Sequence, residues 1–321
     1  MAIGIDDIRA AAARIKGRVA RTPVRRSEWL SDHCGGDVHM KLEVVQPTSS
    51  YKIRGAFNAA LLVRERAAVD DLPRLVTASA GNHGRALAFA ARALRLPLTV
   101  FIAAGAPRAK VDAIRAAGAD LRECRDYDEA ERQAKAHAAG GGGLFISPYS
   151  HPDVIAGAGT IALELLEDLA VIDVVVVPIG GGGLISGIAV ALKALSPATR
   201  VVGVEVAAST PFTSSLAAGH LIEIDVGASL ADGLTGNLDP DTVTLDIVRA
   251  LVDEIVVVDE PSLRRALAGT IVNEHVLIEG AAAAGVAAVL DSQGAPGGQV
   301  AVVLTGANID HARVIDVLST R

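Results

Sequence analysis

The chain has 321 residues, of which 50% are hydrophobic and 3% aromatic, and its net charge is -7 at pH 7. This length is typical of two domains of about 150 residues each, or of one large α/β unit. The sequence contains no Lys/Arg cluster of the kind that binds nucleic acid. Its apolar runs are far shorter than the about 20 residues of a membrane helix. We therefore expect neither nucleic acid nor membrane as a partner.

The cysteine usage and the amino terminus indicate a reducing compartment. Cys34 and Cys124 stand in unrelated segments, without the spacing of a metal site or a redox pair. The first residues, Met1 to Asp7, lack the basic and apolar regions of a signal peptide. We expect a cytoplasmic protein with free thiols.

Hydrophobic periodicity predicts helices and strands that alternate along the chain. A helix is expected over residues 5–15, and a second over 51–64 with an N-cap from Thr48, Ser49 or Ser50. Predicted strands cover residues 38–42, 75–78, 98–102, 144–146, 174–178, 201–205, 255–258 and 300–304. The other predicted helices cover 83–94, 109–117, 126–138, 161–169, 184–195, 242–251, 262–273 and 281–290, and the glycines at 140–143 are interpreted as a flexible connection. This alternation predicts an α/β fold of two three-layer domains with mostly parallel sheets.

A run of four glycines, Gly180 to Gly183, follows an apolar strand and precedes a helix. Backbone N–H groups at such a turn converge on one anion, and the helix dipole adds positive potential, so a phosphate site is predicted. The dinucleotide fingerprint fails, because Ile185 or Ser186 stands where its third glycine should be. Glu205 nevertheless ends the next strand at the place of a ribose-binding acid. A nicotinamide-dependent oxidoreductase therefore stays open as an alternative.

Three further motifs carry reactive or ligand-binding groups. Lys52 lies in the first turn of a predicted helix, where the dipole disfavours a cation and so favours the neutral amine that attacks an aldehyde. The segment 79–84 (Ser-Ala-Gly-Asn-His-Gly) joins a strand to a helix and offers a site for a carboxylate. Thr305 ends a strand at the ligand-binding edge of a parallel sheet. Alone, Lys52 is better explained as a solvated lysine, and the other two motifs are equally explained as a helix cap and an ordinary turn.

Together, the order and spacing of these motifs resemble the fold type II enzymes that depend on pyridoxal 5'-phosphate (PLP), specifically the threonine/serine dehydratase and serine racemase family. The resemblance extends from Arg21 to Asn308, and the segments 155–157 and 231–233 share it. It implies a fold like that of the tryptophan synthase β subunit. It also implies a large PLP-binding domain of residues 1–52 and 148–321, a small domain of residues 53–147 inserted in it, and a homo-oligomer, either a dimer or a tetramer.

The resemblance also implies a role for each motif residue. Lys52 would form the Schiff base with PLP and later remove the α-proton of the substrate. The other cofactor-binding residues would be Tyr51 on the ring face, Asn82 at the ring oxygen, Gly180, Gly181, Gly182, Gly183 and Leu184 around the phosphate, and Thr305 at the ring nitrogen. Ser79, Ala80, Gly81 and His83 would bind the substrate. The implied reaction is β-elimination, a dehydration and deamination that converts L-threonine or L-serine into a 2-oxo acid and ammonia.

Four positions depart from the family pattern or vary within it. Ala80 replaces the serine that racemases use as their second acid/base, which disfavours serine racemase. Pro211 replaces the aspartate of the racemase metal site, so we expect no resident metal and at most a monovalent or weak divalent cation near Glu205. Tyr149 and Ala158 leave the substrate open, including other 3-hydroxy amino acids such as 3-hydroxyaspartate. A silent amino-acid-binding regulator is disfavoured, because a binder needs no imine-forming lysine.

Overall fold

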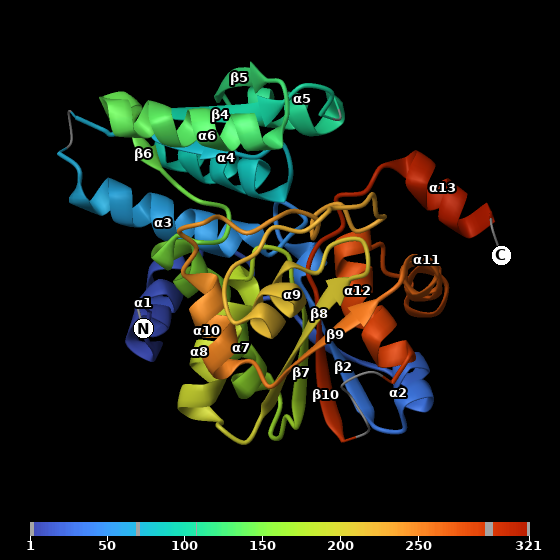
Figure 1. The fold of residues 1–321 in the computed structure, drawn as a ribbon. Coiled ribbons are helices and arrows are strands. Elements are labelled where there is room, and N and C mark those ends of the chain that lie inside the picture. Colours follow the sequence, from blue (N-terminus) through green and yellow to red (C-terminus); the bar gives the residue numbers. More distant parts are fainter. Residues whose placement is uncertain (1–2, 69–70, 107, 293–297, 320–321) are drawn as a thin grey trace.

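The computed structural model describes residues 3–68, 71–106, 108–292 and 298–319; residues 1 and 321, the outer limits of the predicted large domain, lie outside them. The described chain forms a six-stranded sheet of order β1-β2-β10-β7-β8-β9 and a four-stranded sheet of order β5-β4-β3-β6. Figure 1 shows the four-stranded sheet with its helices as a separate group, and helix α3 (Lys52–Arg66) between this group and the larger one.

The six-stranded sheet is parallel except at one edge. Its strands are β1 (Val24–Ser27), β2 (Asp37–Leu42), β7 (Val174–Pro178), β8 (Arg200–Val206), β9 (Glu254–Val258) and β10 (Gln299–Leu304), and only the β1–β2 pair among them is antiparallel. Val174 and Val176 pack into one core cluster, whereas Val175 and Val177 pack into another on the opposite face. A strand apolar on both faces is the expected pattern for a parallel sheet covered on both sides.

Helices supply the two outer layers of this sheet. One face is covered by α2 (Glu28–Cys34), α11 (Glu260–Gly269), α12 (Gly280–Leu290) and α13 (His311–Ser319). The other is covered by α1 (Ile5–Ile15), α7 (Pro152–Asp168), α8 (Gly183–Leu195), α9 (Pro211–Ala218) and α10 (Thr244–Leu251). Among the described residues, no helix combines the length and apolarity needed to cross a membrane.

The four-stranded sheet is parallel throughout and has the same layering. It consists of β3 (Leu75–Ala78), β4 (Leu98–Ala103), β5 (Asp120–Cys124) and β6 (Leu144–Phe145). Helices α3, α4 (Asn82–Leu94) and α5 (Arg108–Ala116) share one core cluster with it, and α6 (Tyr127–His137) packs on the other face. The predicted α/β fold with two three-layer parts is confirmed, while the domain boundaries at residues 52 and 148 stay a prediction.

Several element predictions were wrong for identifiable reasons. Helix α7 begins at Pro152 rather than at residue 161, because Gly157, which looks like a turn residue, is a packing residue. A β-carbon on Gly157 would lie 2.6 Å from the carbonyl oxygen of Arg54 on α3. Strand β5 was missed because most of its side chains are exposed, so it shows no alternation of apolar residues. The elements β1, α2, α9 and α13 were not predicted either.

The predicted N-cap of α3 was also wrong. The residue that precedes the helix is Tyr51, and no side chain caps it. Ser50 Oγ is buried and has no hydrogen-bond partner among the described residues. The glycine-rich connection predicted at residues 140–143 is partly a π-helical turn, Ala138–Gly142, which continues from α6. Within the segment 50–55, the helix therefore begins at Lys52.

Candidate active site

A cavity of about 440 Å³ lies between the two sheets and collects every site residue predicted from the sequence. The predicted residues that line it are Tyr51, Lys52, Ser79, Ala80, Gly81, Asn82, His83, Gly180, Gly181, Gly182, Gly183, Leu184 and Thr305. They follow the carboxyl ends of β3, β7 and β10, or begin the helix α3. Because ligands bind at the carboxyl edge of open parallel sheets, the topology itself brings these four segments together.

Lys52 is the first residue of α3, and its amine faces the cavity. The Nζ atom donates a hydrogen bond to the carbonyl oxygen of Pro148 (2.8 Å) and lies 5.2 Å from the centre of the Tyr51 ring. The first turn of α3 contains no acidic residue. The amine is thus held by a neutral acceptor, and no carboxylate of the described residues forms an ion pair with it that would prevent its reaction with an electrophile.

A buried ion network fixes the start of α3 behind the lysine. The Arg54 guanidinium donates to both oxygens of Glu43 (2.8 Å each) and to both oxygens of Glu164 (2.7 and 2.8 Å). Glu164 also accepts from Lys41 Nζ at 2.6 Å. Burial alone would lower the pKa of Arg54, but Glu43 and Glu164 outweigh it and raise that pKa. Arg54 is therefore charged. Its ion pairs hold the first turn of α3, which begins at Lys52, against β2 and α7.

The glycine run forms the loop that joins the end of β7 to the start of α8 at Gly183. Gly182 is the N-cap with φ +82°, a left-handed conformation that favours glycine. A β-carbon on Gly181 would lie 2.2 Å from the Tyr149 ring, and one on Gly183 would lie 2.6 Å from the Tyr149 carbonyl oxygen. Only glycine fits this packing. The loop places backbone N–H groups and the positive end of a 13-residue helix beside the cavity, which suits a phosphate.

Thr305 supplies a buried hydroxyl without a partner. It is 4% exposed, follows the last strand β10, and lines the cavity. Its Oγ1 atom makes no hydrogen bond to any described residue. A buried polar atom of this kind usually marks a ligand contact or a bound water. It is therefore suited to meet a polar atom of a bound cofactor.

The turn after β3 lines the cavity with backbone groups. Gly81 N donates to Ser79 Oγ (3.2 Å), and a β-carbon on Gly84 would lie 2.0 Å from the Ser79 carbonyl oxygen, so the turn packs tightly on the start of α4. His83 is 2% exposed, and neither ring nitrogen has a hydrogen-bond partner among the described residues. Burial, and then the charge of Lys52, lower the pKa of His83 to about 3. The imidazole is neutral at physiological pH.

Comparison with known proteins agrees with this geometry. A family model described as "Pyridoxal-phosphate dependent enzyme" matches residues 15–306. The chain belongs to this family of PLP-dependent enzymes. It is 40% identical to an L-threonine ammonia-lyase of Thermotoga maritima over 309 residues, which cover 96% of this chain and 76% of the relative. It is 35% identical to the L-threo-3-hydroxyaspartate ammonia-lyase of Saccharomyces cerevisiae, over 98% of this chain and 95% of the relative.

A solved structure gives the same result at the level of the fold. The structure of maize serine racemase superposes with a TM-score of 0.91 at 32% identity, over 100% of this chain and 98% of the other. PLP carries an aldehyde, a phosphate, a ring nitrogen and a ring hydroxyl. The lysine amine, the glycine loop, the unpartnered hydroxyl of Thr305 and the amide of Asn82 line the same cavity. The residues present therefore fit the cofactor of the family.

Sequence reasoning missed several residues that line the cavity of this PLP-family protein. They include Lys110, Tyr127, Leu234, Thr235, Gly236, Asn237 and Glu279, whereas Asp232 lies in the segment 231–233, which shares the family resemblance but was given no role. Lys110 on α5 and Asp232 in the opposite loop form an ion pair across the cavity at 3.5 Å. Most of these residues come from loops without a motif. Glu279 alone carried a signal, because it is a charged residue that directly precedes a helix containing no polar side chain.

Glu205 has a different environment from the one expected. Its buried carboxylate accepts from Phe212 N (2.8 Å), Thr213 N (2.9 Å) and Thr213 Oγ1 (2.6 Å), at the start of α9. Burial raises the pKa of Glu205 despite these three donors. Its oxygens are thus engaged by the protein, not by a ribose. The described residues contain no group of three or more His, Cys, Asp and Glu that could hold a metal ion.

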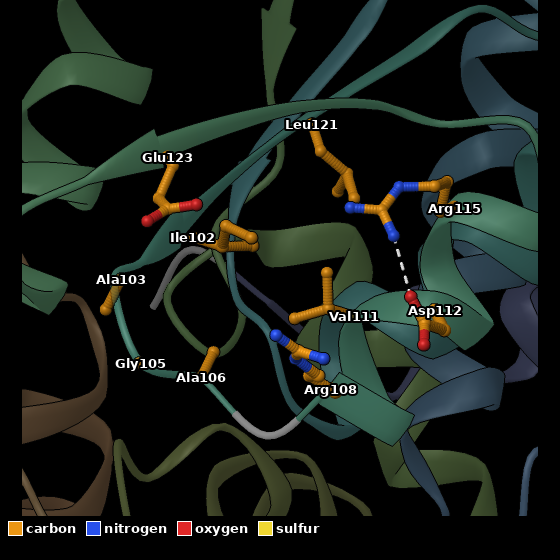
Figure 2. Close-up of a pocket in the computed structure, with 10 residues that line it drawn as sticks. All are labelled: Ile102, Ala103, Gly105, Ala106, Arg108, Val111, Asp112, Arg115, Leu121 and Glu123. Atoms are coloured by element: carbon orange, nitrogen blue, oxygen red, sulfur yellow. Dashed lines mark hydrogen bonds and ion pairs between the residues drawn. The ribbon is translucent and has the colours of Figure 1, made fainter.

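A second cavity, of about 790 Å³, lies at the carboxyl end of β4 beside α5 (Figure 2). Arg115 there pairs with Asp112 on the same helix at 2.6 Å, and Arg108 and Glu123 lie on opposite sides. This cavity contains none of the predicted site residues. It also contains none of the buried, unpartnered polar atoms found in the described part of the chain. Its size alone does not make it a site.

Proposed function

We propose that this protein is a PLP-dependent ammonia-lyase that dehydrates and deaminates a small β-hydroxy amino acid, L-threonine or L-serine, to a 2-oxo acid and ammonia. The observation that carries the proposal is the convergence on one cavity of the Lys52 amine, the glycine loop of α8 and the unpartnered hydroxyl of Thr305. The 40% identity to an L-threonine ammonia-lyase supports this reaction.

Each residue then has a defined task. Lys52 would bond to the cofactor aldehyde, Tyr51 would lie on the ring face, and Asn82 would donate to the ring oxygen. Gly180, Gly181, Gly182, Gly183 and Leu184 would hold the phosphate, and Thr305 would contact the ring nitrogen. Bound PLP would supply the electron sink that makes the α-proton of an amino acid acidic.

Substrate handling falls to Lys52 and to the turn after β3. Ser79, Ala80, Gly81 and His83 would surround the substrate carboxylate, with donors from the backbone and from the neutral imidazole. Lys52, which already lies in the cavity at the Pro148 carbonyl, would take the α-proton once its amine is free. The β-hydroxyl would then leave as water, balanced by the proton that Lys52 has taken up. Because the hydroxyl of Thr305 is neutral, it does not stabilise a protonated ring as a carboxylate would, which favours prompt loss of the β-substituent.

Two related activities are alternatives. Dehydration of 3-hydroxyaspartate is supported by the yeast relative of that name. Serine racemase is supported by the maize structure, but Ala80 lines the cavity with a methyl group that can neither give nor take a proton. The nicotinamide-dependent alternative loses its basis, because the family is PLP-dependent and the oxygens of Glu205 are engaged at α9.

The cellular setting and assembly remain predictions. We expect a cytoplasmic homo-oligomer, either a dimer or a tetramer. A monovalent or weak divalent cation near Glu205 also stays a proposal, and the hydrogen bonds of Glu205 to α9 count against it.

The test is a spectrum followed by an assay. The purified protein should absorb in the visible range, and L-threonine or L-serine should give 2-oxo acid, with D-serine formation and 3-hydroxyaspartate turnover measured in parallel. Lys52→Ala should abolish both colour and turnover, whereas Lys16→Ala, at an exposed position, should change neither. A colourless protein that does not take up PLP would refute the proposal.

A further inference from the structure

Glu279 is a buried carboxyl group in the cavity wall, and the proposed reaction gives it no task. It is 8% exposed and stands at the N-cap of α12. Its side chain does not cap that helix. A β-carbon on Gly306 would lie 2.5 Å from Glu279 Oε1, so the carboxylate packs against the turn after β10. The side chain is therefore held toward the cavity, away from the helix it precedes.

Both oxygens of Glu279 accept hydrogen bonds from fixed donors. Oε1 accepts from Asn82 Nδ2 at 2.7 Å, and Oε2 accepts from the backbone N of Asn308 at 3.1 Å. A carboxylate can accept from both donors. In a protonated acid or an amide, one of the two positions carries a hydrogen of its own, which would face the N–H group of Asn82 or of Asn308. The two contacts connect α4, in the four-stranded part, with the turn that follows β10, in the six-stranded part.

The orientation of the Asn82 amide follows from its neighbours. Asn308 Nδ2 donates to the Thr48 carbonyl oxygen (3.0 Å), which can only accept, and to Asn82 Oδ1 (2.7 Å). Asn308 Oδ1 accepts from Arg85 at 2.5 Å. Asn82 therefore presents its oxygen to Asn308 and its nitrogen to Glu279. Among the described residues Glu279 is the single recorded partner of that nitrogen, so one N–H remains for a ligand in the cavity.

The surroundings of Glu279 disfavour its charge overall. Burial raises the pKa of Glu279 to about 7, and Asp232 adds to this effect, whereas Asn82, Lys110 and the Asn308 backbone lower it. A carboxyl group kept in such a place costs folding free energy when it ionises. This cost makes a purely structural role a poor explanation for the residue.

We propose that Glu279 is a positioning residue that holds the Asn82 amide with one N–H directed into the cavity, where it meets the ring oxygen of the cofactor. The inference rests on the proposed function, since it assumes that PLP occupies this cavity. Glu279 acts through Asn82 and needs no contact with the substrate.

The test compares Glu279→Gln with Glu274→Gln. Glu274 is likewise 8% exposed and ion-paired, to Arg25 at 2.9 Å, but it does not line the cavity. Glu279→Gln should weaken PLP binding to the apoprotein about tenfold, the range for loss of a charged hydrogen bond, and shift the absorbance maximum of the bound cofactor. The melting temperature of the apoprotein should change little, because removal of a buried charge offsets the mispaired amide. Glu279→Asp, which keeps both acceptors, should recover part of the affinity, and it serves also if the glutamine variant does not fold.

A double-variant comparison tests whether Glu279 acts through Asn82. In an Asn82→Ala background, Glu279→Gln should weaken PLP binding by less than about twofold, because its target is gone. An equal loss in both backgrounds, or unchanged PLP affinity in Glu279→Gln, would overturn the inference and leave the proposed function standing. Failure of the wild-type protein to bind PLP would overturn both.

Discussion

The ring of Tyr149 occupies the space that a side chain on Gly181 would need, since an added β-carbon would lie 2.2 Å from its Cγ atom. The tyrosine hydroxyl in turn accepts a hydrogen bond from the backbone N of Asp239 at 2.9 Å, so the ring is held at both ends. The second glycine of the run is therefore required by packing, independently of any phosphate it binds.

Gly181→Ala should weaken PLP binding at least about tenfold, because either the loop or the ring must move by more than 1 Å, roughly, to remove the clash. A titration of the apoprotein with PLP, followed by absorbance, measures this. Gly140→Ala is the matched control, since its β-carbon would meet nothing within 4 Å. Wild-type affinity in Gly181→Ala would show that the loop has room that the structure does not give it.

Thr305→Val should separate cofactor binding from stability. The valine has the same shape but lacks the hydroxyl, which is buried and unpartnered within the described part of the chain. Removing it should leave the apoprotein equally stable or about 1 kcal/mol more stable, because an unsatisfied group is lost, while PLP binds several-fold more weakly. Urea unfolding of the apoprotein and PLP titration give the two numbers. A destabilised apoprotein would mean that the hydroxyl has a structural partner.

Arg54→Met should destabilise the protein by about 3–5 kcal/mol, because it leaves Glu43 buried and without its cation. Equilibrium unfolding in urea measures the change. Arg26→Met is the control: in the Arg26–Asp37 pair both side chains are 45% exposed, so solvent screens the pair and its loss should change stability little. Similar losses in the two variants would contradict the anchoring of α3 through the buried network.

Glu131→Gln should change how stability depends on pH. Burial first, and then Asp239, raise the pKa of Glu131 from 4.5 to about 8, so ionisation is disfavoured in the folded state. The wild-type protein should therefore lose stability as the pH rises through this interval, by about 2 kcal/mol after allowance for the nearby Lys135 and for solvent. Melting temperatures between pH 5 and pH 9 should fall less in Glu131→Gln (roughly half as much). Glu28→Gln, with a side chain 89% exposed, should follow the wild type.

The sequence allowed prediction of the parts of the site whose chemistry is local. The glycines at 180–183 are recognisable by residue type and by their position between a strand and a helix, whereas Lys52 and Thr305 were assigned only through the resemblance that all the motifs share. Glu279 could not be assigned in this way, because its partners Asn82 and Asn308 are distant in sequence and meet it only in the folded chain.

The same distinction explains the errors in the fold. Strand β5 lies at the edge of its sheet, where four of its five side chains are not buried, so periodicity does not reveal it. In the sequence alone, Gly157 and Gly159 indicate the end of a helix. In the structure they are packing residues, because a β-carbon on either would lie under 3 Å from the backbone of a neighbouring helix. Only the tertiary contacts between α3, α7 and α8 decide that these glycines are helical.

The chain passes between the two sheets twice, just before α3 and between β6 and α7, and the hydrogen bond from Lys52 to the Pro148 carbonyl joins these two crossings (Figure 1). If the four-stranded part swings on the six-stranded part, the two crossings define the hinge axis. A point on a hinge axis moves least. Such a swing would separate Lys110 from Asp232 and open the cavity, while the Lys52 amine keeps its distance from the glycine loop.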